Sequence, residues 1–294
     1  MTDKTPEIHE ALAVYAPEKI ETDRVPPGYK QTEVGVIPED WETLPLLELL
    51  DFRNGVNADK SAYGKGTPFI NVLEIITHTH LQFADIPGQV TLPKLLINSY
   101  AVQRGDILFN RTSETQEEVG LASVYLGNEA VVFGGFVIRG RNLGTGIDEI
   151  YSGYAFRSPT IRAQIISKGQ GAVRANIGQQ ELSKVLISLP PLHEQRAIAA
   201  ALSDVDALIS ALDKLIAKKR AVKTAAMQQL LTGKQRLPGF SGEWEVKRLG
   251  EVAYVNMGQS PSSRNYNVRG VGLPLIQGNA DIEDRKTIAR VWTT

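Results

Sequence analysis

The segment Pro190–Phe240, PPLHEQRAIAAALSDVDALISALDKLIAKKRAVKTAAMQQLLTGKQRLPGF, decides how the rest of the chain is organised. It predicts one long helix. Pro190 and Pro191 suit a helix start, because the first turn leaves unpaired the backbone N–H that proline lacks. Gly233 and Pro238 are typical of a helix end. We expect a helix over residues 191–236, and about 40 residues at 1.5 Å each make a rod of roughly 60 Å. A helix of that length indicates a spacer.

Apolar side chains recur along this helix in alternating steps of four and three residues. The stripe consists of Ile198, Leu202, Val205, Ile209, Leu212 and Ile216. This spacing is that of a narrow coiled-coil seam, so it predicts that the helix packs against a partner helix.

The composition limits the classes of function. At 294 residues the chain is long enough for two domains. It contains no cysteine, which excludes disulfides, thiolate metal sites and a cysteine nucleophile. The first residues carry acidic side chains instead of an apolar signal sequence, and no apolar run approaches the ~20 residues of a membrane span. We therefore expect a cytoplasmic protein.

Charge is distributed unevenly, although the formal net charge is only −1. Residues 1–50 contain 4 Lys or Arg and 11 Asp or Glu, whereas residues 193–236 contain 8 and 4. Residues 1–28 predict an acidic, loosely ordered leader. The mildly basic remainder permits nucleic-acid binding without requiring it.

Residues 29–190 predict one α+β domain. Strand-like apolar runs occur at 107–110, 121–126 and 130–139, and the last run is interrupted by Gly134-Gly135, which predicts a bulge or a close backbone approach. Ser158-Pro159 predicts the start of a short helix that Gly169 can end. Residues 185–189 predict a last strand before the long helix.

An internal repeat flanks the long helix. The matched pairs are Trp41 with Trp244, Leu46 with Leu249, Glu48 with Glu251 and Gly55 with Gly258, all at an offset of 203 residues. Slightly further on, the segment 68–70 resembles 274–276. Residues 237–294 therefore predict the start of a second domain of the first kind, without a counterpart of residues 93–240. So short a piece of a domain of about 160 residues should be poorly stable.

The sequence offers no convincing catalytic centre. His78 and His80 are spaced for one face of a strand, but no Cys or nearby acid completes a tetrahedral set, so we predict no metal site. The Gly-rich segments match neither a dinucleotide fingerprint nor a Walker A loop, and the Asn-Pro-Pro-aromatic signature of base methylation is absent. No Ser lies in a nucleophile elbow. We therefore expect a binding or assembly role rather than an enzyme.

Several polar loops carry the groups that read DNA. Arg pairs with guanine and Asn or Gln with adenine, while Lys and backbone donors hold phosphates. The residues predicted to bind DNA are Lys60, Lys65, Asn110, Arg111, Thr112, Ser113, Arg139, Arg141, Lys168, Arg174 and Asn176. Asn110, Arg111, Thr112, Arg139, Arg141, Arg174 and Asn176 are expected to lie on one concave face.

Four motifs accompany the repeat. They are YKQTEVGVIPEDW at residues 29–41, GDIL at 105–108, LPPLHEQRAIA at 189–199 and LLTGKQRLPGF at 230–240. Together they resemble the specificity (S) subunits of type I restriction–modification systems. The resemblance covers nearly the whole chain.

The resemblance implies a target recognition domain at 29–190, a conserved spacer and docking helix at 191–236, and the start of a second target recognition domain at 237–294. Each such domain reads half of a bipartite site in double-stranded DNA. Two conserved helices pack antiparallel and dock the modification (methyltransferase) subunits, so the seam has an expected partner. S-adenosylmethionine, ATP and Mg²⁺ are expected on the modification and restriction subunits, with no cofactor on this chain.

Three classes of function stay open for a chain of this extent, and the first, a recognition subunit, has two forms. A half-length subunit could pair with a second copy through the long helix, by two-fold symmetry. It could equally be an inactive or switchable truncation. From a different class, the chain could be a coiled-coil assembly adaptor that never contacts DNA; a stand-alone methyltransferase or nuclease is a third, enzymatic interpretation.

Overall fold

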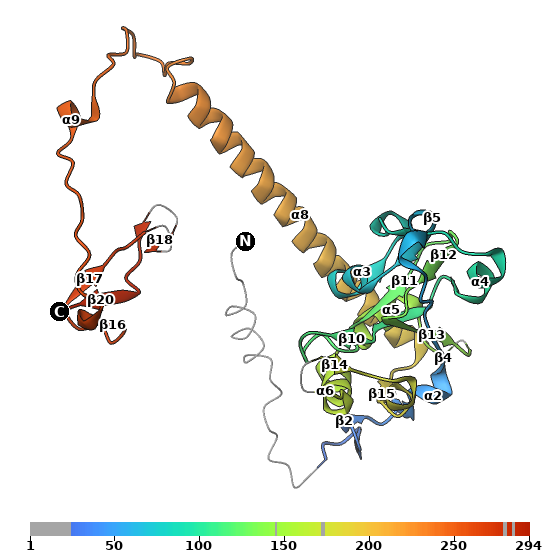
Figure 1. The fold of residues 1–294 in the computed structure, drawn as a ribbon. Helices are drawn as coiled ribbons and strands as arrows, with labels where there is room; N and C mark the ends of the chain where they lie inside the picture. Colours follow the sequence, from blue (N-terminus) through green and yellow to red (C-terminus); the bar gives the residue numbers. More distant parts are fainter. Residues whose placement is uncertain (1–24, 145, 172–173, 279–280, 284–285) are drawn as a thin grey trace. The chain divides into compact units, whose positions relative to one another are not determined.

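The computed structural model describes residues 25–144, 146–171, 174–278, 281–283 and 286–294. The chain forms two compact units, divided between Lys214 and Leu215. Figure 1 shows the fold. The predicted acidic leader falls almost wholly on residues 1–24, which lie outside the described part of the chain.

The first unit is an α+β domain, as predicted. In chain order its elements before the long helix are β1 (Tyr29–Thr32), β2 (Gly35–Pro38), β3 (Glu42–Pro45), α2 (Leu46–Leu49), β4 (Leu50–Asn54), η1 (Lys60–Ala62), β5 (Tyr63–Ile70), α3 (Val72–Thr77), β6 (His80–Leu81), η2 (Phe83–Asp85), β7 (Gln89–Val90), α4 (Lys94–Ser99), β8 (Ala101–Val102), β9 (Ile107–Asn110), β10 (Thr112–Ser113), β11 (Ala122–Tyr125), β12 (Val131–Phe133), β13 (Val137–Asn142), α5 (Glu149–Ala155), α6 (Pro159–Lys168), β14 (Ala175–Asn176), α7 (Gln179–Leu182) and β15 (Leu186–Leu189).

Two larger sheets form the body of this unit. One has the strand order β4-β13-β9-β11-β6 and the other β7-β5-β12-β8. Hairpin β1–β2 and the pairs β3–β15 and β10–β14 lie outside them. Helices α3 and α5 pack against the first sheet at β11.

The chain crosses from one sheet to the other at Gly134-Gly135. The single strand predicted for residues 130–139 is therefore wrong: β12 and β13 belong to different sheets. The close backbone approach predicted there is confirmed. A Cβ on Gly55 would lie 2.0 Å from the carbonyl oxygen of Gly134, and Val56 forms a parallel bridge to Gly134.

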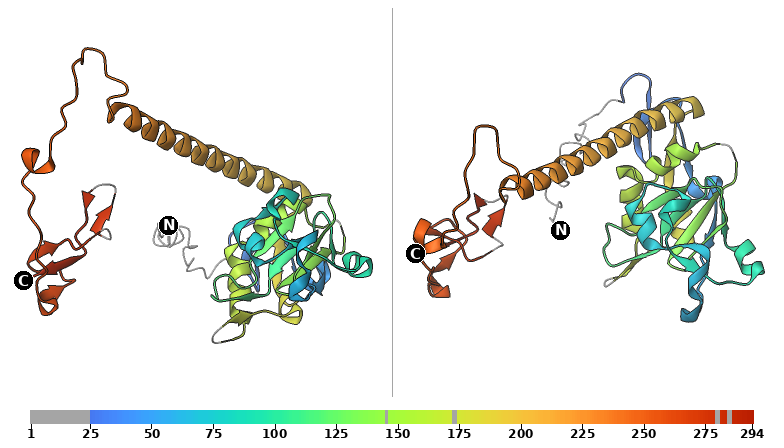
Figure 2. Two further views of the ribbon diagram at one scale, coloured as in Figure 1. Left: turned by 45° about the horizontal axis from the view of Figure 1, so that its top comes forward. Right: turned by 90° about the horizontal axis from the view of Figure 1, so that it is seen from above.

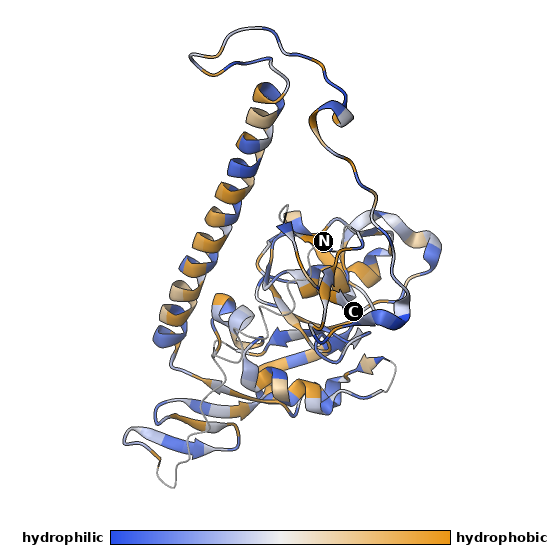
Figure 3. Cartoon of the chain, turned by 90° about the vertical axis from the view of Figure 1, so that its left-hand side faces the viewer, coloured by the Kyte–Doolittle hydropathy of each residue, from blue (hydrophilic) through white to orange (hydrophobic). Residues whose placement is uncertain are grey.

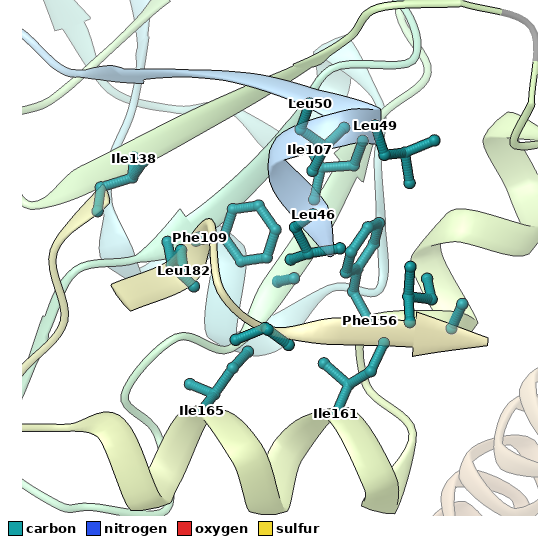
Figure 4. Packing of buried hydrophobic residues seen from close by; sticks show 14 of the residues in the cluster. Leu46, Leu49, Leu50, Ile107, Phe109, Ile138, Phe156, Ile161, Ile165 and Leu182 are labelled. Atoms are coloured by element: carbon teal, nitrogen blue, oxygen red, sulfur yellow. The ribbon is translucent and has the colours of Figure 1, made fainter. Parts of the chain in front are cut away.

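The main apolar core lies between α2, the first sheet and α6. Leu46, Phe109, Phe156 and Ile165 are fully buried in it (Figure 4). The rings of Phe109 and Phe156 meet edge to face with centroids 5.4 Å apart, an arrangement that adds to the apolar burial. This core holds the first sheet and the α6–α7 layer as one body.

The long helix α8 (Leu192–Leu230) is continuous (Figure 2), and it ends before the predicted limit at residue 236. Its first turn is fixed to the domain. The buried Gln195 amide donates to the carbonyl oxygens of Gly146 (3.0 Å) and Pro190 (2.9 Å) and accepts from the Asp148 N–H (2.9 Å). Trp41 Nε1 donates to a Glu194 carboxylate oxygen over 3.1 Å. These bonds fix the direction in which α8 leaves the domain.

The predicted seam is largely uncovered. Ile198 packs against the main core and, with Leu202 and Trp41, lines an apolar groove of about 340 Å³. From Leu202 to Ile216 the seam side chains are 40–53% exposed. Figure 3 shows apolar residues along most of α8. No helix in the described part of the chain is long and apolar enough to cross a membrane.

The second unit begins inside α8, at Leu215, and its elements after that helix are short. They are α9 (Leu249–Val252), η3 (Ser263–Asn265), β16 (Tyr266–Asn267), β17 (Leu273–Leu275), β18 (Ile282–Glu283), β19 (Lys286–Thr287) and β20 (Val291–Thr293). The strand order of its larger sheet is β16-β20-β17. Helix α9 and turn η3 lie 203 residues after α2 and η1, so the structure repeats where the sequence does.

Candidate nucleic-acid interface

Two polar loops, far apart in the sequence, meet where β10 pairs antiparallel with β14. Thr112 faces Asn176 and Ser113 faces Ala175 in this ladder. The Thr112 hydroxyl donates to Asn176 Oδ1 over 2.6 Å, and Ile177 N–H donates to the Arg111 carbonyl oxygen over 3.0 Å. The pairing places Arg111 and Thr112 beside Asn176, as the sequence predicted for these three residues.

The second of these loops turns back sharply on itself. Gln170 and Asn176 exchange backbone hydrogen bonds of 2.9 and 2.8 Å, which close the loop between them. Gly171 has φ +116°, and a Cβ there would lie 2.1 Å from the carbonyl oxygen of Arg174. Only glycine fits this position without strain, so the local sequence specifies the turn.

Two buried residues that were predicted to bind DNA hold the first loop in shape through hydrogen bonds. Asn110 is fully buried, and its amide donates to the Glu118 carbonyl oxygen (3.0 Å) and accepts from the Thr112 N–H (3.3 Å). Ser113 is buried too, and its hydroxyl donates to a Glu118 carboxylate oxygen over 2.9 Å. These bonds occupy both side chains in shaping the loop. They correct the predicted placement of Asn110 on a concave face, and Ser113, which was predicted to bind DNA, is buried beside it.

Between the two loops and α7 lies an open polar cleft of about 540 Å³. The polar cleft is lined by Asn54, Arg111, Lys168, Gln170, Asn176 and residues 177–181. Arg111 donates once, to the carbonyl oxygen of Gly135 over 3.3 Å, which leaves most of its guanidinium donors free of partners in the described part of the chain. Two cations and several amides thus face one space, and these are the groups that bind the edges of bases.

Arg174 lies at the exposed end of the second loop. Its guanidinium pairs with the carboxylate of Glu114 in the other loop over 3.7 Å, and both side chains are more than half exposed. An exposed pair of this kind contributes little to stability, so Arg174 remains available to a charged ligand.

Arg139 and Arg141 do not share this surface. Arg139 is 4% exposed and donates to the carbonyl oxygen of Ala101 over 3.1 Å, with the Asp51 carboxylate 3.8 Å away. Burial is the main cause that lowers the pKa of Arg139. Arg141 forms a bidentate pair with the buried Asp106 over 2.9 and 2.7 Å, and that hydrogen bonding raises its pKa. The structure therefore corrects the expectation of one concave face for both arginines.

The two predicted lysines lie on another part of the domain. Lys60 is in turn η1 and Lys65 in β5, and both are exposed. Neither lines the polar cleft. A direct contact of either lysine with DNA stays a prediction.

His78 and His80, which are spaced as a possible metal pair, each contact other groups of the domain. His80 Nε2 lies 2.9 Å from the carbonyl oxygen of Ile150, and its ring meets Tyr154 edge to face at 4.7 Å. His78 Nε2 lies 3.8 Å from an Asp85 oxygen. The described residues contain no group of three or more His, Asp or Glu side chains arranged to hold a metal ion.

Three residues that line the polar cleft were not predicted from the sequence. Asn54, Gln170 and Gln180 are exposed and line the polar cleft. Asn54 ends β4 and Gln180 lies in α7, both in segments without a basic cluster, so composition gave no signal for them. Gln170 lies two residues after Lys168, which was predicted to bind DNA, and that position was the available signal.

The chain thus combines a polar cleft built by two loops with a long helix whose apolar seam is uncovered, and these are the features to compare with known proteins. The family model of the type I restriction modification DNA specificity domain matches residues 38–219, which is more than half of the chain. The chain belongs to this family.

Curated relatives carry matching names. The chain is 32% identical over 275 residues to a protein assigned as the MjaX type I restriction enzyme specificity subunit of Methanocaldococcus jannaschii, with 86% of this chain and 63% of that one covered. It is 27% identical over 226 residues to the MjaVIII specificity subunit of the same organism, with 73% and 51% covered. The chain thus spans roughly half to two thirds of the length of these relatives.

Solved structures give similar matches. A chain from a study of complex assembly and conformational transition of the type I R-M system has a TM-score of 0.49 and 21% identity, with 76% of this chain and 50% of that chain covered. The type I restriction-modification system S subunit from M. genitalium has a TM-score of 0.49 and 17% identity, with 85% of this chain and 62% of that chain covered.

Proposed function

We propose that this chain is a DNA sequence-recognition subunit of a type I restriction–modification complex, and that its first unit reads half of a bipartite site. The observation that carries the proposal is the polar cleft, in which Arg111, Lys168 and neutral amides converge on one open space in a chain of this family. Guanidinium and amide groups match the major-groove edges of guanine and adenine, and lysine suits phosphate.

We also propose that α8 sets the spacing of the complex and packs against a second, antiparallel helix while docking the modification subunit. Its uncovered seam from Leu202 to Ile216 supports this role. Beyond the first turns, which carry Glu194 and Arg196, charge along α8 is polarised: acids occupy positions 204, 206 and 213, and bases occupy 214, 218, 219, 220 and 223.

Two copies of α8 in antiparallel orientation would place each acidic part opposite a basic part, which favours that orientation over the parallel one. A second copy of this chain is therefore one partner that fits the helix. Sedimentation that shows only monomer at high protein concentration and low salt would contradict such self-association.

Catalysis is assigned to the partner subunits in this proposal. The modification subunit would use S-adenosylmethionine, and the restriction subunit would use ATP and Mg²⁺, while this chain supplies recognition and no cofactor site. The cytoplasm, where double-stranded chromosomal DNA is reached, is the proposed location.

The test is Arg111→Ala in the full chain, reconstituted with the modification subunit. The complex is titrated with DNA that carries the site bound by the unsubstituted complex, identified beforehand by selection from random-sequence duplexes. Loss of a base contact by Arg111 should weaken binding by about 1–3 kcal/mol and relax one base position. Lys94→Ala, which removes an exposed charge outside the cleft, is the matched control and should leave the base preference unchanged. Unaltered specificity in Arg111→Ala would count against the cleft as the reading surface.

The adaptor interpretation remains the second candidate, because the uncovered seam alone would serve an assembly protein. A salt series separates the two functions. A recognition subunit should bind DNA with an affinity that falls steeply as salt rises, since phosphate contacts release counterions. Binding of the modification subunit without any salt-dependent or sequence-dependent DNA binding would favour the adaptor.

A further inference from the structure

Two glutamines in the polar cleft have side chains with no assigned role in the fold. Gln170 and Gln180 are both exposed and both line the cleft. Other polar groups around them are engaged: the Asn176 amide accepts from Thr112 and donates to the Arg174 carbonyl oxygen over 3.1 Å. Within the described part of the chain, neither glutamine amide has a hydrogen-bond partner.

The backbone that carries Gln170 is held firmly. Its N–H and C=O bond the C=O and N–H of Asn176, and the preceding Gly169 caps α6 by donating to the carbonyl oxygens of Ile165 and Ile166. The Ile165 side chain is fully buried in the main core. Gln170 therefore presents a free amide from a fixed position.

Gln180 is fixed from the other side of the cleft. It lies in α7, whose Leu182 is fully buried. The adjacent Gln179 amide, in the orientation that satisfies both of its groups, donates to the Phe52 carbonyl oxygen (3.3 Å) and accepts from the Asn54 N–H (3.0 Å). These contacts tie α7 to β4, so the Gln180 side chain also starts from a rigid element.

We propose that Gln170 and Gln180 are specificity-determining residues that read the adenine of an A·T pair in the half-site. This inference rests on the proposed DNA-recognition function. An amide offers a donor and an acceptor side by side, which is the pattern that adenine N7 and N6 present in the major groove. Phosphate offers acceptors only, and Arg111 and Lys168 in the same cleft serve it better than a neutral amide.

The experiment uses the full chain with its modification subunit and a library of random-sequence duplex DNA, from which bound molecules are selected and sequenced. Gln170→Ala and Gln180→Ala should each lower the preference for A·T at a position of the same half-site by about 5- to 150-fold, which corresponds to the range for one bidentate base contact. Other positions should keep their preference.

Gln82→Ala removes an exposed glutamine outside the cleft and is the matched control. Gln170→Glu and Gln180→Glu keep the side-chain shape but replace the amide donor by an acceptor, so preference at the affected position should move from adenine toward cytosine. Thermal unfolding of each variant should match that of the unsubstituted chain.

Unchanged selected sequences in both alanine variants overturn the inference, and so does uniform weakening at every position, which is the mark of phosphate contacts. A complex of the unsubstituted chain that selects no sequence overturns the proposed function itself. The two failures are therefore distinguishable.

Discussion

The two copies of the repeat fold alike locally. In the first copy β5 pairs with β7, with Tyr63 and Thr67 both opposite Val90. In the second copy Tyr266 and Leu273 are both opposite Thr293. The backbone bond from Thr91 N–H to the Ala62 carbonyl oxygen (2.8 Å) recurs as Thr294 to Asn265 (3.2 Å).

The copies differ in what covers them. In the first copy β5 also pairs with β12, and Phe69 lies with Val132 in a small buried cluster. In the second copy the only partner of β17 among the described residues is β20. Leu46 is 0% exposed in the first copy, and its equivalent Leu249 is 66% exposed.

This difference distinguishes structure that forms from neighbouring residues from structure that depends on distant segments. The turn, the short helix and the hairpin register arise from residues close in sequence, because both copies form them. Burial in the first copy arises from residues of β9, β12, β13 and α6, and the described residues after α8 form no equivalents of these elements. The repeat therefore provides matched substitutions, in which the same change is made with and without the covering layer.

The largest expected contrast is between Leu46→Ala and Leu249→Ala. Replacing the buried Leu46 by alanine leaves a cavity in the packed core. The free energy of unfolding of the first unit should therefore fall by about 2–5 kcal/mol. Leu249 is mostly solvated, and its loss should change stability by no more than about 0.5 kcal/mol. Urea unfolding of the full chain, followed by far-UV circular dichroism, measures both. Equal losses would show that the second copy is covered in solution.

A smaller contrast is expected between Gly55→Ala and Gly258→Ala. A methyl group on Gly55 would lie 2.0 Å from the Gly134 carbonyl oxygen, whereas one on Gly258 meets nothing within 4 Å. Backbone atoms cannot yield as a flexible side chain does, so Gly55→Ala should cost about 1–3 kcal/mol by overpacking. Gly258→Ala should be near neutral in the same unfolding assay. A neutral Gly55→Ala would mean that the crossing at Gly134 can open.

Much of the fold was predictable because it depends on local chemistry. Pro159 and Gly169 bound α6 as predicted, and the repeat at Trp41 and Trp244 identified elements that recur at one offset. The apolar steps from Ile198 onward identified the seam before its exposure was known. For α6 and the seam, the signal lies within a few residues of the feature it predicts.

The site was predictable only in part, because composition does not show which side of a strand a residue faces. Asn110 and Arg139 have the residue types of DNA contacts, yet both are buried: Asn110 bonds Glu118 and Thr112 of its own loop, and Arg139 bonds the distant Ala101. The pairing of β10 with β14 brings Arg111 to Asn176 across 65 residues of the chain. The same long-range pairing builds the polar cleft that Gln170 and Gln180 line.

The smallest contrast concerns the two matched tryptophans. Trp41, the residue before β3, donates its Nε1–H to the Glu194 carboxylate and so ties the start of β3 to the first turn of α8. Trp244 is 54% exposed and lies under the Arg236 guanidinium at 5.7 Å from the ring centroid. Trp41→Phe keeps most of the apolar surface but loses a hydrogen bond to a charged acceptor, which should cost about 1–2 kcal/mol in the first unit.

Trp244→Phe should leave the unfolding of the first unit unchanged, because phenylalanine still offers a ring to Arg236 and an exposed cation–π contact contributes only about 0.5–1 kcal/mol. Glu194→Gln is the complementary variant: it retains an acceptor for Trp41 but removes the charge, so its cost should fall below that of Trp41→Phe. If Trp41→Phe combined with Glu194→Gln costs the full sum of the two single changes, the indole and the carboxylate are not coupled. The first turns of α8 would then be held by the hydrogen bonds of Gln195 to Gly146, Asp148 and Pro190, together with the packing of Ile198 and Ala199 in the main core.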